Sequence, residues 1–176
     1  MPLFGIDLKD DWIVQSQGAV AETDQKILRD YQLEAIKTIS KNFDGGNRRF
    51  LLEMATGTGK TLLAAALIKL FLKTGNASRI LFLVDRIELA DQANQNISSY
   101  LKEYNIAIFK ENKEQALQNQ VVIATIQSLS YNQNYLKYFS QFDFDLLISD
   151  EAHRSIYGNN RAIFEYFEGA KIGLTA

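Results

Sequence analysis

A turn rich in glycine and threonine stands near the start of the chain, in the sequence MATGTGKT at residues 54–61. Gly57 and Gly59 allow a tight backbone turn that points amide N–H groups inward. Lys60 could reach the terminal phosphates of a nucleotide, and the Thr61 hydroxyl could ligate Mg²⁺. The alternative is a plain glycine-rich turn, because Met54 stands where the strict pattern GxxxxGK[ST] requires glycine. The intact GKT half favours a phosphate-binding loop, whose residues are Thr56, Gly57, Thr58, Gly59, Lys60 and Thr61.

Two adjacent carboxylates, Asp150 and Glu151, follow an apolar run at residues 146–148. Asp150 would hold Mg²⁺, directly or through a water molecule. Glu151 would orient the attacking water and accept its proton. His153 is the only histidine of the chain, and it suits a hydrogen-bond relay better than a metal site. Alone, the carboxylate pair could be an exposed acidic turn; together with GKT it predicts a centre for nucleotide hydrolysis.

Short apolar runs that alternate with helical patterns would position these residues. The runs predict strands at residues 49–53, 79–84, 106–109, 120–124, 145–149 and 171–174, the first two of them buried. Apolar spacing predicts helices at residues 27–43, 61–73, 87–104, 111–118 and 161–167, with helix or loop at 126–139. This alternation indicates an α/β fold with a mostly parallel sheet. The carboxyl ends of parallel strands would bring GKT and Asp150 to one edge of that sheet.

Composition limits the class of protein. The chain has 176 residues, a normal size for one domain, and 47% of them are hydrophobic. Its 19 basic and 21 acidic residues give a net charge of −2, which argues against a polybasic nucleic-acid domain. Cysteine is absent, so a disulfide framework is excluded. No apolar run is long enough to span a bilayer, and acidic residues interrupt the start where a signal peptide would lie, so we expect a cytoplasmic protein.

Six ordered motifs resemble the first RecA-like domain of superfamily 2 helicases and translocases. Besides MATGTGKT and the DEAH sequence at 150–153, they are LRDYQ at 28–32, RIELADQ at 86–92, ATIQS at 124–128 and GLTA at 173–176. Together they most resemble the motor of type I and type III restriction-enzyme subunits. The resemblance covers residues 28–176 and implies a RecA-like three-layer P-loop NTPase domain that ends within motif III. It leaves residues 1–27 as an N-terminal extension.

The resemblance implies ATP and Mg²⁺ as cofactors and duplex DNA as a partner. Its implied catalytic residues are Lys60, Asp150, Glu151 and His153. Arg29 and Gln32 would read the adenine; the alternative for both is the amphipathic start of a helix. Arg86, Thr125 and Ser128 would contact DNA phosphates; the alternative for all three is helix capping.

The family's motor has a second RecA-like domain, which supplies an arginine finger to the transferring phosphate. We therefore expect this chain, a fragment of the motor, to bind nucleotide weakly and to hydrolyse it slowly or not at all. In a restriction enzyme, methyltransferase and specificity subunits would be further partners. Two alternatives are a DNA-repair or RNA helicase of the same superfamily, and a non-catalytic module that responds to ATP. Glu151 speaks against the module, because a protein that only binds ATP needs no water-activating carboxylate.

The aromatic stretch at residues 131–144 has two interpretations. Its tyrosines and phenylalanines could form a platform on which bases stack. They could instead belong to a connector that packs over the sheet before the strand at 145–149. We favour the connector, because the helicase resemblance already accounts for this region.

Overall fold

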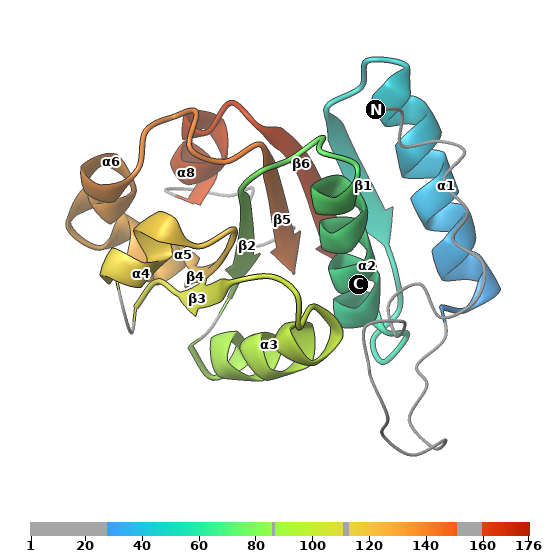
Figure 1. Cartoon of the computed structure of the whole chain (residues 1–176), viewed down its shortest axis with the longest axis horizontal. Coiled ribbons are helices and arrows are strands. Elements are labelled where there is room, and N and C mark those ends of the chain that lie inside the picture. The colour runs from blue at the N-terminus through green and yellow to red at the C-terminus, as the bar shows by residue number, and fades with distance from the viewer. Residues whose placement is uncertain (1–27, 86, 111–112, 151–159) are drawn as a thin grey trace.

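A computed structural model of the chain describes residues 28–85, 87–110, 113–150 and 160–176 (Figure 1). Within these ranges six strands form one sheet, and every neighbouring pair of strands is parallel. The order across the sheet is β1-β6-β5-β2-β4-β3. The strands are β1 (Arg49–Glu53), β2 (Ile80–Val84), β3 (Ile106–Ile108), β4 (Val121–Thr125), β5 (Leu146–Asp150) and β6 (Ala170–Thr175).

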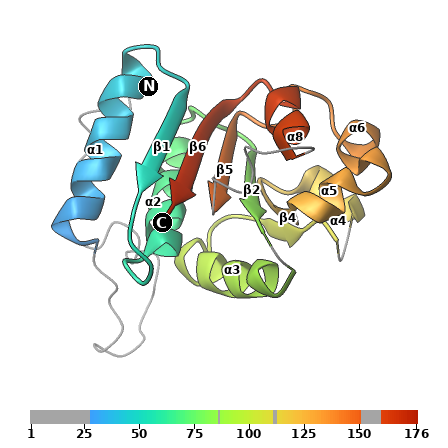
Figure 2. The ribbon, with the colours of Figure 1, turned by 180° about the vertical axis from the view of Figure 1, so that it is seen from behind.

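Helices lie on both faces of this sheet, which gives the molecule three layers (Figures 1 and 2). One face is covered by α1 (Asp30–Asp44), α2 (Lys60–Lys73) and α3 (Ile87–Tyr100). The other face is covered by α4 (Lys113–Gln118), α5 (Ile126–Ser130), α6 (Asn134–Tyr138) and α8 (Asn160–Tyr166). A 3-10 turn, η1 (Tyr131–Gln133), joins α5 to α6. The predicted α/β architecture with a parallel sheet is confirmed.

Alternate residues of each central strand supply two separate cores, as the two-residue period of a strand requires. In β2, Phe82 and Val84 pack towards α2 and α3, whereas Leu81 and Leu83 pack towards the opposite helices. Helix α2 is buried along residues 63–71. The charged member of that run, Lys69, forms an ion pair with Glu103, with 3.2 Å between Nζ and Oε1. This packing fixes α2, and therefore fixes where its first residues lie.

Strand β1 differs from the buried strand that the sequence predicts. It lies at the edge of the sheet, and its residues alternate between exposed and half-buried. Phe50 and Leu52 pack beneath the helices of one face. Leu51 points to the other face and is 63% exposed, in an open groove that also contains Phe164 of α8 and Lys171 of β6. The prediction was wrong because three adjacent apolar residues, FLL, were interpreted as a strand that is buried on both faces of the sheet.

Several helix boundaries also differ from the predicted ones. Helix α1 begins at Asp30 rather than residue 27, because Arg29 is its extended N-cap residue. Helix α3 ends at Tyr100 rather than residue 104, and a turn closed by the bond from Tyr104 N to Leu101 O follows. None of the helices in the described ranges is long and apolar enough to cross a membrane.

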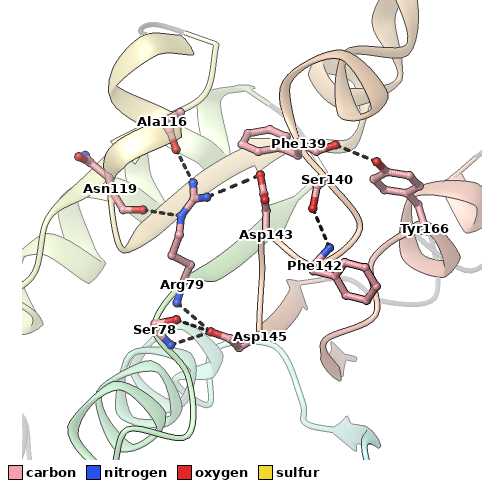
Figure 3. Close-up of polar contacts among 10 residues, drawn as sticks. All are labelled: Ser78, Arg79, Ala116, Asn119, Phe139, Ser140, Phe142, Asp143, Asp145 and Tyr166. Carbon is pink, nitrogen blue, oxygen red and sulfur yellow. Dashed lines mark hydrogen bonds and ion pairs between the residues drawn. The ribbon is translucent and has the colours of Figure 1, made fainter.

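The aromatic stretch after α5 packs as a connector. Phe139 and Phe144 are buried, and their ring centroids lie 5.0 Å apart. Phe144 also contacts Phe167 edge-on at 5.2 Å. The Tyr166 hydroxyl donates to the Phe139 carbonyl at 2.8 Å (Figure 3). The packing interpretation therefore holds for these rings, because buried faces cannot serve as a platform for bases.

A polar cluster ties the amino ends of β2 and β5 together (Figure 3). Asp145 Oδ2 accepts hydrogen bonds from the backbone N–H and the hydroxyl of Ser78, both at 2.7 Å, and from Arg79 N–H at 3.2 Å. The Arg79 guanidinium donates to the carbonyls of Ala116 and Asn119, at the end of α4. The cluster thus joins three segments that are far apart in the sequence.

Asp145 should make stability depend on pH. Burial raises the pKa of Asp145, but the hydrogen bonds from Ser78 and Arg79 and the charge of Arg79 outweigh it and hold the pKa below its ordinary value. A carboxylate whose pKa is lower in the folded state than in the unfolded state stabilises the fold. This stabilisation is fully present above the unfolded-state pKa and is lost as pH falls through the folded-state pKa. We expect Asp145→Asn to lower the free energy of unfolding by about 1 kcal/mol at pH 7, because the carboxylate is partly exposed.

Urea unfolding followed by circular dichroism at several pH values measures this effect. The difference between wild type and Asp145→Asn should shrink as pH falls below the ordinary aspartate pKa. Asp143→Asn is the matched control, because Asp143 Oδ2 lies 3.7 Å from Arg79 Nη1, a longer contact than those of Asp145. Its effect on the free energy of unfolding at pH 7 should be smaller. If the difference in free energy of unfolding between Asp145→Asn and wild type is constant across pH, the pKa of Asp145 is not lowered in the folded protein.

Candidate nucleotide-binding site

The carboxyl ends of the strands bring the predicted site residues to one edge of the sheet, towards which the arrowheads of β1, β2 and β5 point in Figure 1. The glycine-rich loop follows β1, and Asp150 is the last residue of β5. Strand β6 lies between them: Thr175 pairs with Glu53 of β1, and Leu174 pairs with Asp150. Two strand spacings of about 4.8 Å each therefore separate the loop strand from the strand of Asp150.

The loop has the backbone that its glycines predict. Gly57 and Gly59 have φ values of 76° and 84°, in the left-handed region that favours glycine. Gly59 is the N-cap residue of α2, and Lys60 and Thr61 are the first two residues of that helix. The Thr58 hydroxyl donates to Ala55 O at 2.6 Å, which closes the turn. The loop thus ends at the amino terminus of a buried 14-residue helix, where backbone N–H groups and the helix dipole favour an anion.

The start of α1 lies directly against this loop. Gln32 is 1% exposed, and its side-chain amide donates to the carbonyl of Gly59 at 3.1 Å and of Thr58 at 3.3 Å. Its Oε1 accepts from Arg29 N–H at 2.9 Å, as in a capping box. A Cβ atom at Gly59 would lie 2.8 Å from Gln32 Nε2 and would displace this amide, and the φ angle of 84° by itself favours glycine. The structure thus brings the LRDYQ segment and the loop together.

Gln32 was predicted to read adenine, and the structure shows which protein groups its amide contacts. The oxygen of the amide accepts from Arg29 N–H, and its nitrogen donates to the Gly59 carbonyl. The first of these bonds is the helix-start role that was the alternative to adenine reading. Arg29 is exposed, and its guanidinium lies 3.4 Å from the Tyr31 hydroxyl. The adenine contact of these two residues stays a prediction.

Tyr31 contacts the loop although no sequence pattern predicts a role for it. Its hydroxyl donates to the Thr58 carbonyl at 2.6 Å, although 27 residues separate them. The only sequence signal was its place between Arg29 and Gln32, in a segment already assigned to the site. Position in the motif does not reveal a long-range bond to a backbone carbonyl.

The remaining predicted residues fall into two groups. Thr125 is 3% exposed at the end of β4, and its hydroxyl caps α5 by accepting from Ser128 N–H at 3.0 Å. The Ser128 hydroxyl donates back to Thr125 O at 2.8 Å. The structure therefore shows the capping alternative for both residues, and their contact with DNA phosphates stays a prediction. Arg86, Glu151 and His153 lie outside the described residues.

Residues 25–176 match the family described as type III restriction enzyme, res subunit. The chain belongs to this family. The match agrees with the superfamily 2 resemblance, so the chain is a motor domain of the helicase and translocase type. Its glycine-rich loop, Asp150 and the α1 segment are the parts of that motor that the structure places at one edge.

Relatives in this superfamily include both restriction subunits and helicases. The chain is 36% identical over 155 residues to the type I restriction enzyme EcoAI endonuclease subunit of Escherichia coli, covering 84% of the chain and 19% of that subunit. It is 37% identical over 158 residues to the putative mitochondrial ATP-dependent helicase irc3 of Schizosaccharomyces pombe, covering 85% of the chain and 26% of that helicase. The chain therefore spans about a fifth to a quarter of the length of these relatives.

The fold has a close match among solved structures. The Sulfolobus solfataricus SWI2/SNF2 ATPase core in complex with double-stranded DNA superposes with a TM-score of 0.72 at 18% sequence identity. The match covers 84% of this chain and 31% of that one. At such low identity the likeness concerns the fold alone, and it confirms the RecA-like three-layer domain.

Proposed function

We propose that this chain is the ATP-binding half of a DNA translocase from a restriction enzyme. It would couple hydrolysis of Mg-ATP to movement along duplex DNA when joined to a second RecA-like domain. The observation that carries the proposal is the glycine-rich loop at the amino terminus of α2, with Asp150 at the same edge of the sheet. The restriction subunits among the relatives support the choice of system.

The loop would bind the phosphates through its backbone and through one side chain. Backbone amides from Thr56 to Gly59 would donate to phosphate oxygens, and the first turn of α2 would add its partial positive charge. Lys60, as the first residue of α2, would reach the β- and γ-phosphates. Both contributions act on phosphate and neither reads the base.

Thr61 and Asp150 fit a magnesium ion by the chemistry of their oxygen atoms, which are the hard ligands that Mg²⁺ prefers. Within the described residues no three His, Cys, Asp or Glu side chains gather into a metal cluster. Mg²⁺ at nucleotide sites is usually held by one or two protein oxygens together with substrate phosphates and water, and Thr61 and Asp150 would supply the protein oxygens. When bound, it neutralises charge on the transferring phosphate.

Glu151 and His153 come one and three residues after Asp150 in the sequence. We propose that Glu151 accepts the proton of the attacking water and that His153 relays hydrogen bonds around it. The second RecA-like domain would add the arginine finger that this half lacks. Methyltransferase and specificity subunits would complete a restriction enzyme.

Thr125 is the last residue of β4, and Ser128 lies in α5, which follows it. Arg86 comes two residues after the end of β2 in the sequence, and β2 pairs with β4. We propose that this part of the edge meets the DNA backbone, with the Ser128 hydroxyl and the Arg86 charge as contacts. The buried Thr125 hydroxyl would act there through the cap it provides. A second candidate function, a DNA-repair or RNA helicase, is favoured by the 37% identity to the irc3 helicase.

Nucleotide binding and turnover by the 176-residue chain test the proposal. We expect these 176 residues to bind Mg-ATP weakly, and to hydrolyse ATP slowly or not at all, with or without duplex DNA, because the family's motor takes its arginine finger from the second RecA-like domain. Calorimetric titration measures the binding, and phosphate release measures the turnover. Absence of nucleotide binding would contradict the assignment of the loop. Brisk hydrolysis stimulated by DNA would show that this half works without the second domain.

A further inference from the structure

Two side chains at the start of α1 hold the carbonyl groups of the phosphate-binding loop. The Thr58 carbonyl accepts from the Tyr31 hydroxyl at 2.6 Å and from the Gln32 amide at 3.3 Å. The neighbouring Gly59 carbonyl accepts from the Gln32 amide at 3.1 Å and from Leu63 N–H, in the first turn of α2, at 3.0 Å. These two consecutive carbonyls are therefore fixed from outside the loop.

Fixing a carbonyl also fixes the N–H group of the same peptide unit. The described peptide bonds are all trans, and in a trans peptide the C=O and the N–H point in opposite directions. The carbonyls of Thr58 and Gly59 face α1, so the N–H groups of Gly59 and Lys60 point away from it. Those are two of the amides that a phosphate-binding loop offers to its anion. A hydrogen bond at the carbonyl also polarises the peptide unit and makes its N–H a better donor.

We propose that Tyr31 is a positioning residue, whose hydroxyl holds the phosphate-binding loop ready for the anion before a nucleotide arrives. The inference rests on the proposed function, since it assumes that the loop binds phosphate. Tyr31 would act through the backbone of Thr58 and would touch neither the base nor the phosphates. Its hydrogen bond is the shorter of the two that fix the Thr58 carbonyl, at 2.6 Å against 3.3 Å.

Tyr31 also allows a clean test, because its ring is 41% exposed. Removing the hydroxyl leaves the ring in place and takes no atom out of the core. Gln32 could not be tested so simply, because it is buried and its amide also caps α1. Tyr131, which is 69% exposed on η1, offers the same change as Tyr31 on the other face of the sheet. Tyr131→Phe is therefore the matched control for Tyr31→Phe.

The experiment measures the affinity of the 176-residue chain for Mg-ATP and for inorganic tripolyphosphate with Mg²⁺. Tyr31→Phe should weaken both by about threefold to tenfold, the usual effect of losing one neutral hydrogen bond. Tyr131→Phe should leave both affinities unchanged. Without ligand, the amide protons of Gly59 and Lys60 should exchange with solvent faster in Tyr31→Phe, and thermal unfolding should verify that this variant remains folded.

Each other outcome overturns the inference in a distinguishable way. A loss of affinity for ATP alone would mean that Tyr31 acts on the base, directly or through Arg29, whose guanidinium donates to the Tyr31 hydroxyl at 3.4 Å. Affinities equal to those of wild type would show that the hydroxyl does not position the loop, and the proposed function would survive. A wild-type chain that binds neither ligand would remove the proposed function together with this inference.

Discussion

Replacing Gly169 with alanine is expected to lower the free energy of unfolding by about 3 kcal/mol or more, the range of severe core and backbone clashes. Gly169 lies between α8 and β6, where the chain passes directly over the start of β5. A Cβ atom there would lie 2.2 Å from the Phe144 carbonyl oxygen and 2.7 Å from the Asp145 carbonyl carbon. Both are backbone atoms, which cannot turn aside as a side chain can.

The surroundings prevent the backbone from yielding easily. Next to Gly169, the N–H of Ala170 donates to the Asp145 carbonyl at 2.9 Å and starts the pairing of β6 with β5. Asp145 is in turn held by Ser78 and Arg79 through its carboxylate. Moving the chain away from Gly169 would thus break the first bonds of a central strand pair and disturb the polar cluster of Figure 3.

Gly45→Ala provides the control for Gly169→Ala. Gly45 follows α1 with a φ of −75°, which any residue adopts, and a Cβ there would meet its nearest atom, Asn42 O, at 3.3 Å. We expect a change of less than about 1 kcal/mol, because only a small adjustment is needed. Urea unfolding of both variants measures the difference. A Gly169→Ala variant that unfolds at the same urea concentration as Gly45→Ala would disprove the steric argument.

Elements whose burial is determined by local pattern were predicted well from the sequence. The continuous apolar runs of β2 and β4 identify buried central strands, and both strands are buried throughout. Strand β1 was misjudged because its place in the sheet depends on β6, which pairs with it from the far end of the chain. An edge strand exposes alternate residues, and the sequence does not state which strand will be at the edge. The exposure of Leu51 is therefore determined by the long-range pairing of β1 with β6, which the local sequence pattern does not reveal.

The same distinction applies to the site. The loop geometry follows from glycine spacing, so Gly57 and Gly59 could be predicted to turn the backbone. The contacts of Tyr31 and Gln32 with the loop carbonyls join segments 26 or 27 residues apart. The residue types alone do not predict these contacts. A glutamine amide can serve a base or a backbone equally well, because it offers the same donor and acceptor to both. Only the packing of α1 against the loop shows that the Gln32 amide contacts the carbonyls of Thr58 and Gly59.

Replacing Lys60 with alanine is expected to weaken binding of Mg-ATP by about a hundredfold, as loss of a charged hydrogen-bond donor to phosphate predicts. A cation at the amino terminus of a helix opposes the helix dipole and alanine is a good helix former, so neither of these two effects lowers stability. Thermal unfolding of Lys60→Ala measures the net change in stability. The affinity is measured at a temperature at which both proteins are folded, so that the loss of affinity is separated from any change in stability.

Lys73→Ala gives the matched control for Lys60→Ala, since Lys73 lies in the last turn of the same helix and carries the same charge. It should change the affinity less than about twofold, because charges beyond the Debye length of about 8–10 Å are largely screened. Isothermal titration with ATP, ADP and AMP locates the contact. If Lys60 reaches the β- and γ-phosphates, Lys60→Ala should reduce the affinity for ATP and ADP and leave that for AMP unchanged. An equal loss for all three nucleotides would place the ammonium group elsewhere in the site, and no loss at all would refute its role in phosphate binding.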